Sequence, residues 1–296
     1  DIPLNVSRSY LQADGAVKKI SNYITKKVGD KLNSLFTKDR EEFQKKWNDI
    51  KVIIDYGMLS EDKFFDKAQK FALYPTVNDE FFTLEELKGK ISKTQTDKDG
   101  KLVILYASNK NEQHPYIETA KEKGYEVLLL DSPIISHLIQ KLETSNEKVT
   151  FSRVDADVID NLIKKENEEI SKLNDKEKEK LKTIIEENVP KEKYTVQLEA
   201  MDSAASPFII TFPEFMRRMK EMQQSGGNSM FGNMPEMYNL IVNVNNPINS
   251  EILKSKSKDK KQRLINQSLD LAKLSQNLLK GEDLTSFIKR SIDFIK

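Results

Sequence analysis

The segment from residue 97 to residue 142 constrains the fold most, because its hydrophobic pattern changes period along the chain. A short apolar run over 102–106 and a second over 125–130 both have the length of buried strands. A helical pattern follows each run, the first beginning near Pro115 and the second near Pro133. Strand, helix, strand and helix at this spacing form a βαβ unit. The two strands are therefore expected to be parallel, with helices packed on their sheet.

Helical periodicity dominates the chain before this unit. Apolar residues recur three and four positions apart in two successive stripes, the first being Val17, Ile20, Ile24, Val28, Leu32 and Leu35 and the second Phe43, Trp47, Ile50 and Ile54. Gly57 stands where the second helix would end with a glycine C-cap. Thr83 and Glu86 have the spacing of a capping box, which predicts a helix that begins at Leu84.

The composition changes near residue 155, where we place a domain boundary between residues 1–155 and 156–296. A highly charged helical pattern follows over 164–188, and Asn174 with Asp175 would break it in two. Beyond it, the pattern predicts strands over 194–198 and 237–244, a Met-rich helix and a Gly-rich loop between them, and two helices over 260–280 and 284–295. The expected fold class is α/β and then α+β: a helical segment, the βαβ unit, and an α+β domain.

The composition excludes several classes of function. Lys and Arg number 48 and Asp and Glu 47, so neither nucleic acid nor an anionic membrane is an expected partner. The chain has no cysteine, which rules out disulfides and fits a reducing cytoplasm. No apolar run approaches the ~20 residues of a membrane-spanning helix. The chain begins at Asp1 directly inside a sequence motif, which we interpret as the start of a piece of a longer protein.

Residues that could form a self-sufficient active site are scarce. His114 and His137 are the only histidines, and neither has a neighbour at metal-ligand spacing. The loop over 225–228 lacks the Gly-Lys-Ser/Thr of a phosphate-binding loop. We therefore expect this chain by itself to bind no metal or cofactor and to catalyse no reaction. The alternative is an enzyme with its site at the carboxyl ends of strands 102–106 and 125–130.

Several motifs, in order along the chain, resemble one known family. They are Asp1-Ile2-Pro3-Leu4-Asn5-Val6-Ser7-Arg8 followed by Leu11-Gln12, then Gly124-Tyr125-Glu126-Val127-Leu128-Leu129-Leu130 with Pro133-Ile134, and later Ser206-Pro207 before an amphipathic helix. These motifs resemble the middle and C-terminal domains of the ninety-kilodalton heat-shock chaperones, in their bacterial form. The resemblance covers nearly the whole chain, and the opening motif is its most specific part.

The resemblance implies a role for the opening motif in ATP hydrolysis. Arg8 falls on the family's arginine that reaches the γ-phosphate of ATP held by a separate N-terminal domain, and Gln12 falls on a supporting polar position. A guanidinium suits this role because its fork of donors can neutralise charge on phosphate oxygens. Ser9 replaces the family's usual acidic residue, which leaves the local hydrogen bonding open. ATP and magnesium are therefore expected in the intact protein and not in this chain alone.

A methionine-rich helix is the first candidate surface for protein binding. Six of the eight methionines lie between Met216 and Met237. Four residues of this helix lie on or beside one face, namely Phe215, Met216, Met219 and Met222. Methionine is unbranched and polarizable, so such a face adapts to varied partners. The face could instead pack against its own domain; the resemblance implies that it contacts clients, which are unfolded or partly folded proteins.

The last two helices form the second candidate surface, because each is apolar over a wide arc. Helices of this kind need cover on several sides. Packing within one chain could supply that cover, whereas the resemblance implies a homodimer held by these helices. The expected interface residues are Leu271, Leu274, Leu278, Phe287, Ile288 and Ile292.

The resemblance thus implies a cytoplasmic molecular chaperone that, in the intact protein, is an ATP-driven dimeric clamp on unfolded or partly folded proteins. The alternative is a structural scaffold that dimerises and has no link to an ATPase. For a scaffold, Arg8 and the methionine-rich face would be incidental.

Overall fold

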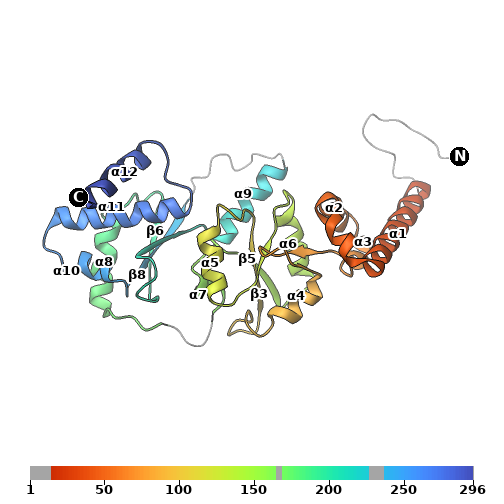
Figure 1. Ribbon diagram of the computed structural model, residues 1–296, viewed down its shortest axis with the longest axis horizontal. Coiled ribbons are helices and arrows are strands. Elements are labelled where there is room, and N and C mark those ends of the chain that lie inside the picture. Colours follow the sequence, from red (N-terminus) through yellow and green to blue (C-terminus); the bar gives the residue numbers. More distant parts are fainter. Residues whose placement is uncertain (1–14, 165–168, 227–236, 296) are drawn as a thin grey trace. The chain divides into compact units, whose positions relative to one another are not determined.

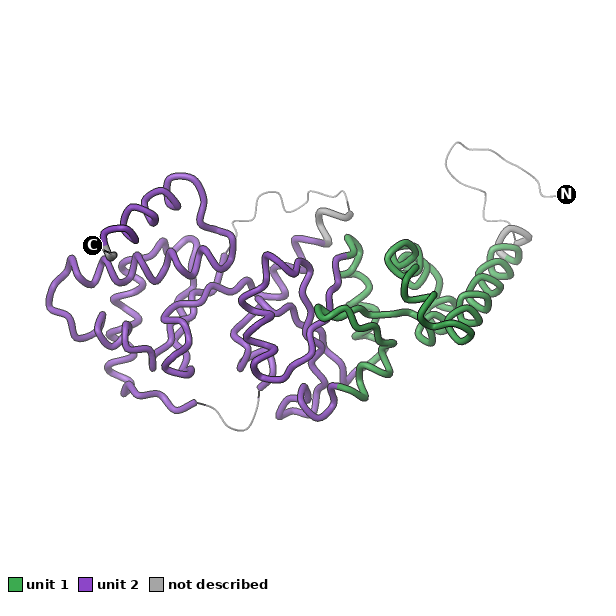
Figure 2. The backbone as a smooth tube through the Cα atoms, viewed as in Figure 1, with its two compact units in different colours: residues 1–90, 132–146 green, residues 91–131, 147–296 purple. Residues whose placement is uncertain are grey.

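The computed structural model describes residues 15–164, 169–226 and 237–295, which contain helices and three small sheets (Figure 1). The chain divides into two compact units, residues 1–90 with 132–146 and residues 91–131 with 147–296 (Figure 2). The predicted fold class is confirmed, since a helical segment precedes a parallel βαβ unit and an α+β region. The domain boundary near residue 155 stays a prediction.

The first unit is mainly helical. Phe43, Trp47, Ile54 and Met58 recur at helical spacing on one face of its second helix and are buried. The rings of Phe43 and Phe71 meet edge to face, with centroids 6.3 Å apart. Fully burying such a side chain stabilises the fold by about 1.5–3 kcal/mol. The elements of this unit are α1 (Gly15–Lys38), α2 (Arg40–Ser60), α3 (Asp62–Ala68), β1 (Tyr74–Pro75), β2 (Phe81–Phe82), α4 (Leu84–Ile91) and α6 (Ile135–Thr144).

The apolar stripe predicted for the first helix is present in α1, but several of its residues face solvent. Ile20, Ile24 and Val28 are all exposed. Helix α1 approaches α3 at Gly29, where a Cβ atom would lie 3.3 Å from the Cδ atom of Lys67. The two helices are thus close together at Gly29, whereas these residues of the apolar stripe face solvent.

The capping box predicted at the start of α4 is confirmed. The backbone N of Thr83 donates to Oε2 of Glu86 at 2.8 Å, and the backbone N of Glu86 donates to Oγ1 of Thr83 at 3.3 Å. Arg40 of α2 donates to the same carboxylate at 2.5 and 2.7 Å. The hydrogen bond from Arg40 is the main reason that the pKa of Glu86 falls to about 2. One carboxylate thus caps α4 and ties it to α2.

The prediction that Gly57 is a helix C-cap is wrong. Gly57 lies inside α2, and its carbonyl accepts a hydrogen bond from the backbone N of Glu61 at 3.1 Å. A Cβ atom at this position would lie 2.9 Å from Cε1 of the buried Phe64 ring of α3. A glycine is needed here because the aromatic ring packs directly on the helix backbone.

The described residues of the second unit form two three-stranded sheets. In the first, the strand order is β4-β3-β5; β3 is parallel to β4, as predicted for the βαβ unit, and it is also parallel to β5. In the second, the order is β6-β8-β7, with β6 parallel and β7 antiparallel to β8. The elements of this unit are β3 (Leu102–Ala107), α5 (His114–Glu122), β4 (Val127–Leu129), β5 (Val149–Arg153), α7 (Ile159–Leu162), α8 (Asp175–Glu186), β6 (Tyr194–Glu199), β7 (Phe208–Thr211), α9 (Glu214–Gly226), β8 (Tyr238–Asn243), α10 (Pro247–Lys254), α11 (Lys258–Ser275) and α12 (Gly281–Ile295).

The second unit differs from the sequence predictions in several places, which include the unpredicted short helix α7. The pattern does not predict β7, which has only four residues between two prolines, or α10. Within the charged stretch predicted to be helical, residues 169–174 are not helical. Asn174 ends this segment by capping α8, since its side chain accepts a hydrogen bond from the backbone N of Glu177 at 3.0 Å.

Four buried asparagines near the end of β8 hold the loops around the second sheet. They are Asn243, Asn245, Asn246 and Asn249. Their side-chain amides donate to backbone carbonyls of residues 170, 201, 202, 205, 207 and 243. A buried loop cannot leave its carbonyls unpaired without a cost of about 1–3 kcal/mol for each. These amides therefore make it possible for the loops to lie close to the core.

Gly57→Ala is expected to destabilise the chain, although alanine is the better helix former. The gain in helix propensity is about 1 kcal/mol, whereas overpacking against the Phe64 ring costs typically about 1–3 kcal/mol. Thermal unfolding followed by circular dichroism should show a lower midpoint. Gly89→Ala in α4 is the matched control, because a Cβ atom there meets nothing within 4 Å. Equal midpoint shifts in the two variants would contradict the close packing at Gly57.

Candidate interaction surfaces

Helix α9 exposes two apolar residues and buries an arginine, which is the reverse of a usual amphipathic helix, although its Lys220 is exposed. Phe215 is 72% exposed and Met219 is 38% exposed, whereas Arg217 is only 3% exposed. Met216 is half-buried. Two of the residues predicted to bind clients, Phe215 and Met219, therefore share one accessible face. Three predicted site residues lie outside what the structure describes: Arg8, Gln12 and the side chain of Met222.

The carboxylate of Glu214, at the start of α9, is the centre of the inward-facing charged contacts. Its Oε1 accepts hydrogen bonds from the hydroxyl of Tyr106 at 3.0 Å and from Nε of Arg218 at 2.7 Å. Its Oε2 accepts from the backbone N of Arg153 at 3.2 Å, and Arg217 also pairs with the carboxylate. Burial works to raise the pKa of Glu214, but the two arginines outweigh it and hold that pKa below its usual value. Glu214 is therefore ionised at neutral pH.

Arg217 lies between two carboxylates and an aromatic ring. Its Nη1 donates to Oε1 of Glu221 at 2.5 Å, its Nη2 donates to Glu214 and to the hydroxyl of Tyr106, and its guanidinium carbon lies 5.5 Å from the Tyr106 ring centroid. Burial alone would lower the pKa of Arg217, but these neighbours raise it above its usual value. A charge buried to this extent is stable only while its partners stay in place.

Glu214, Tyr106 and Arg153 contribute to this surface, although the sequence pattern did not predict them there. Glutamate followed by arginine three and four residues later is the usual pattern of a solvated helix face. Nothing local distinguishes such a pattern from a buried one. The partners of Glu214 on β3 and β5 lie 108 and 61 residues away in the chain.

Helix α11 buries one face, and both end helices leave an apolar face uncovered. Ile265, Leu269 and Ala272 of α11 are buried in the core with the second sheet. The predicted interface residues include four that are 45–49% exposed, namely Leu271, Leu274, Ile288 and Ile292. The other two, Leu278 and Phe287, are half-buried, and Leu278 packs against the core of its own chain. Their role in dimerisation stays a prediction.

Asp270 of α11 holds α12 beside it. Its buried carboxylate pairs with Arg290 of α12 and with Lys273, whose Nζ lies 3.3 Å from Oδ1. Lys273 also contacts Asp283 of α12 at 3.2 Å. Nε2 of Gln267 donates to Oγ of Ser291 at 3.2 Å. These polar contacts fix one side of α12 on α11.

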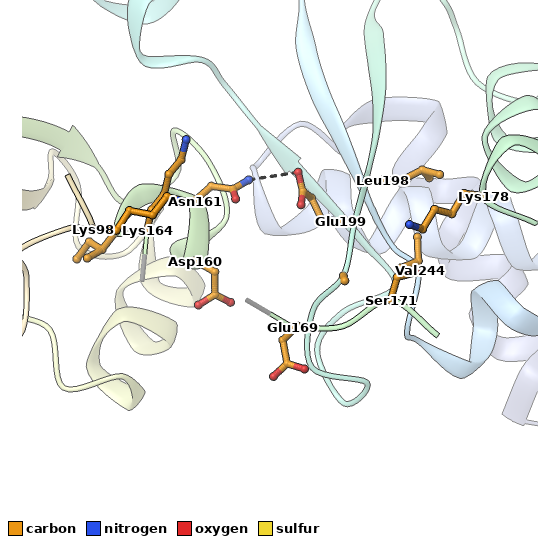
Figure 3. A pocket seen from close by; sticks show the side chains of 12 residues that line it. Lys98, Asp160, Asn161, Lys164, Glu169, Ser171, Lys178, Leu198, Glu199 and Val244 are labelled. Atoms are coloured by element: carbon orange, nitrogen blue, oxygen red, sulfur yellow. Dashed lines mark hydrogen bonds between the residues drawn. The ribbon is translucent and has the colours of Figure 1, made fainter. Parts of the chain in front are cut away.

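A polar cleft of about 490 Å³ lies beside α7 and the end of β6 (Figure 3). Its charged residues are of both signs, namely Lys98, Lys164 and Lys178 with Asp160, Glu169 and Glu199. Nδ2 of Asn161 and Oε1 of Glu199 lie 3.5 Å apart across it. Because its charges balance, the cleft has no evident preference for an anion or a cation.

Metal binding and membrane insertion have no support in the part of the chain that the structure describes. No cluster of three or more His, Cys, Asp or Glu side chains is placed there to hold a metal ion. None of the described helices combines the length and the apolar character that crossing a bilayer requires.

Comparison with known proteins identifies the family. The family model described as Hsp90 protein matches residues 1–290. The chain is 41% identical to the chaperone protein HtpG of Bacteroides thetaiotaomicron over 363 residues, which cover 100% of this chain and 53% of that protein. It is 42% identical to HtpG of Porphyromonas gingivalis over 257 residues, which cover 86% of this chain and 38% of that protein. The chain thus spans about half the length of the first of these relatives. It belongs to the Hsp90 family, as the motifs at its start and in its βαβ unit led us to expect.

Proposed function

We propose that the chain is the C-terminal part of a dimeric, ATP-driven molecular chaperone of the cytoplasm. Its membership of the Hsp90 family supports the chaperone role. The exposed apolar face of α9 is the single observation that carries the proposal. In this proposal, residues 1–155 are the remainder of the middle domain, and residues 156–296 form the domain for dimerisation and client contact.

The clients in this proposal are unfolded or partly folded proteins, which present apolar side chains of varied shape. Phe215 and Met219 lie one helical turn apart and supply a large aromatic ring and a flexible thioether. A surface of this kind can repack around different partners, because methionine has several accessible rotamers. Arg217 of α9 is buried, so its charge does not oppose an apolar client, whereas Lys220 beside Met219 is exposed.

Replacing Phe215 and Met219 with serine should weaken the binding of a permanently unfolded probe, reduced carboxymethylated α-lactalbumin. Burying each of these side chains contributes up to about 1.5–3 kcal/mol, so the double variant should bind at least about tenfold more weakly. Fluorescence anisotropy of the labelled probe measures the affinity. Ile170→Ser is the matched control, because Ile170 is 85% exposed and lies outside α9. An unchanged affinity in the double variant, or an equal loss in the control, would contradict the assignment.

We also propose that a second copy of the chain covers the free faces of α11 and α12. The supporting observation is that four large apolar side chains on these helices are nearly half exposed in a single chain. A two-fold contact would place each face against its own copy, which lets one patch cover another.

Ile288→Glu should convert the dimer to a monomer, because the dimer would have to bury an unpaired carboxylate. Its side chain is 49% exposed, so the fold of one chain should tolerate the change. Sedimentation velocity over a concentration series measures the mass. Lys289→Gln is the control, since it changes the net charge by the same amount at an exposed position of the same helix. A wild-type chain that sediments as a monomer at every concentration would contradict the proposal.

For the intact protein, we propose that Arg8 and Gln12 act on ATP and magnesium held by an N-terminal domain. Arg8→Ala should lower steady-state phosphate release by at least about tenfold, because one cationic donor to the transferring phosphate is lost. ATP binding should change far less, and the neighbouring Ser9→Ala variant should keep most of the turnover. Unchanged turnover in Arg8→Ala would remove the catalytic role of Arg8 and would leave the client-binding proposal untouched.

A further inference from the structure

The parallel sheet of the second unit has a carboxyl edge of the kind that binds ligands in other α/β proteins. β3 comes first in the chain and lies at the centre, with β4 on one side and β5 on the other. Ligands bind outside the carboxyl ends of the strands where the strand order reverses in this way. In this chain α9 contacts that edge, through Tyr106 near the end of β3 and Arg153 at the end of β5 (Figure 1).

Helix α9 also completes the outer edge of β5. On one side of β5, the C=O of Lys148 and the N–H of Val154 hydrogen-bond to β3. Successive residues of a parallel strand point their backbone groups to opposite sides, so those of Phe151 and Arg153 point away from β3. Glu214 accepts a hydrogen bond from the N–H of Arg153 at 3.2 Å. Nη2 of Arg218, one turn later on α9, donates to the C=O of Phe151 at 2.7 Å. Two side chains of one helix thus pair with two successive outward groups of the strand.

The contacts that hold α9 are mainly ionic and hydrogen-bonding. Glu214, Arg217 and Arg218 face the sheet, whereas Phe215 and Met219 face solvent. Because Phe215 and Met219 already face solvent, releasing the helix would expose neither of them further. Charge-assisted hydrogen bonds are strong and geometrically specific, so they can fix both the position and the rotation of the helix.

We propose that Glu214, Arg217 and Arg218 form a polar latch, whose docking on Tyr106 and on the outer edge of β5 fixes the client-binding face of α9. In the docked state, Phe215 and Met219 form one preformed surface. In the released state, each client would have to order the helix again, which lowers affinity. This inference rests on the proposed client-binding function and adds the element that regulates it.

Hydrogen exchange of the amides of residues 214–221, followed by mass spectrometry, tests the docking without any client. Glu214→Gln should speed exchange about tenfold, because Arg217 keeps its buried charge and loses its nearest carboxylate. Tyr106→Phe removes one hydroxyl, keeps the ring packing, and should speed exchange about threefold. The amides of β8 should stay protected in both variants.

Glu251→Gln is the matched control for the loss of a carboxylate. Glu251 pairs with Lys260 at 2.5 Å on the surface, away from α9, so exchange of α9 should not change. Unchanged exchange of α9 in both Glu214→Gln and Tyr106→Phe would overturn the latch. If Glu214→Gln also exposes the amides of β8, its fold has failed, and Tyr106→Phe then decides the outcome.

Binding of reduced carboxymethylated α-lactalbumin to the same two variants tests the link to clients. Affinity should fall by about threefold to tenfold in both, although Phe215 and Met219 are intact. Faster exchange of α9 with unchanged affinity would overturn the link. If the double serine variant at Phe215 and Met219 binds the probe normally while Glu214→Gln still speeds exchange, the client-binding function fails and the docking contact stands.

Discussion

A strand at the edge of a sheet leaves backbone groups that need partners, and in this chain that need decides where α9 lies. Phe151 and Arg153 on β5 offer one outward C=O and one outward N–H. A guanidinium and a carboxylate one turn apart on a helix, Arg218 and Glu214, satisfy both. The helix must then turn its other side to solvent, and that side carries Phe215.

The end helices obey a related constraint, because their apolar arcs are wider than one contact can cover. α11 buries Ile265 and Leu269 against the second sheet, and Asp270 binds α12 through Arg290. An uncovered apolar face then remains on both helices. Apolar surface that a chain leaves exposed in a continuous patch is a common site of association. The two candidate surfaces therefore have one origin, in helices whose inner contacts leave apolar residues outside.

The sequence predicted a structural feature correctly where the residues that form it lie close together in the chain. Thr83 and Glu86 bond to each other as their spacing requires. The lengths of the two apolar runs predicted strands, and their alternation with helical patterns predicted that these strands are parallel. The family resemblance is likewise carried by short motifs, each made of residues that are neighbours in the chain.

Contacts between segments that lie far apart in the chain could not be predicted from the sequence. Gly57 near a helix end suits either a C-cap or a close approach, and the position of the Phe64 ring decides between them. Glu214 and Arg218 have the same spacing on a solvated helix as on a buried one. Only the folded chain brings Tyr106 to them, from 108 residues away.

One side of α9 stabilises the fold and the other side does not. The two sides are therefore under different selection, the first for stability and the second for what the helix contacts. Substitutions at Glu214 or Arg217 would change the free energy of folding, whereas substitutions at Phe215 or Met219 would change it little. Selection on mutations of the exposed side therefore depends mainly on the molecules that this side contacts. In the proposed client-binding role, the range of bound proteins can change over evolutionary time while the fold that carries α9 stays constant.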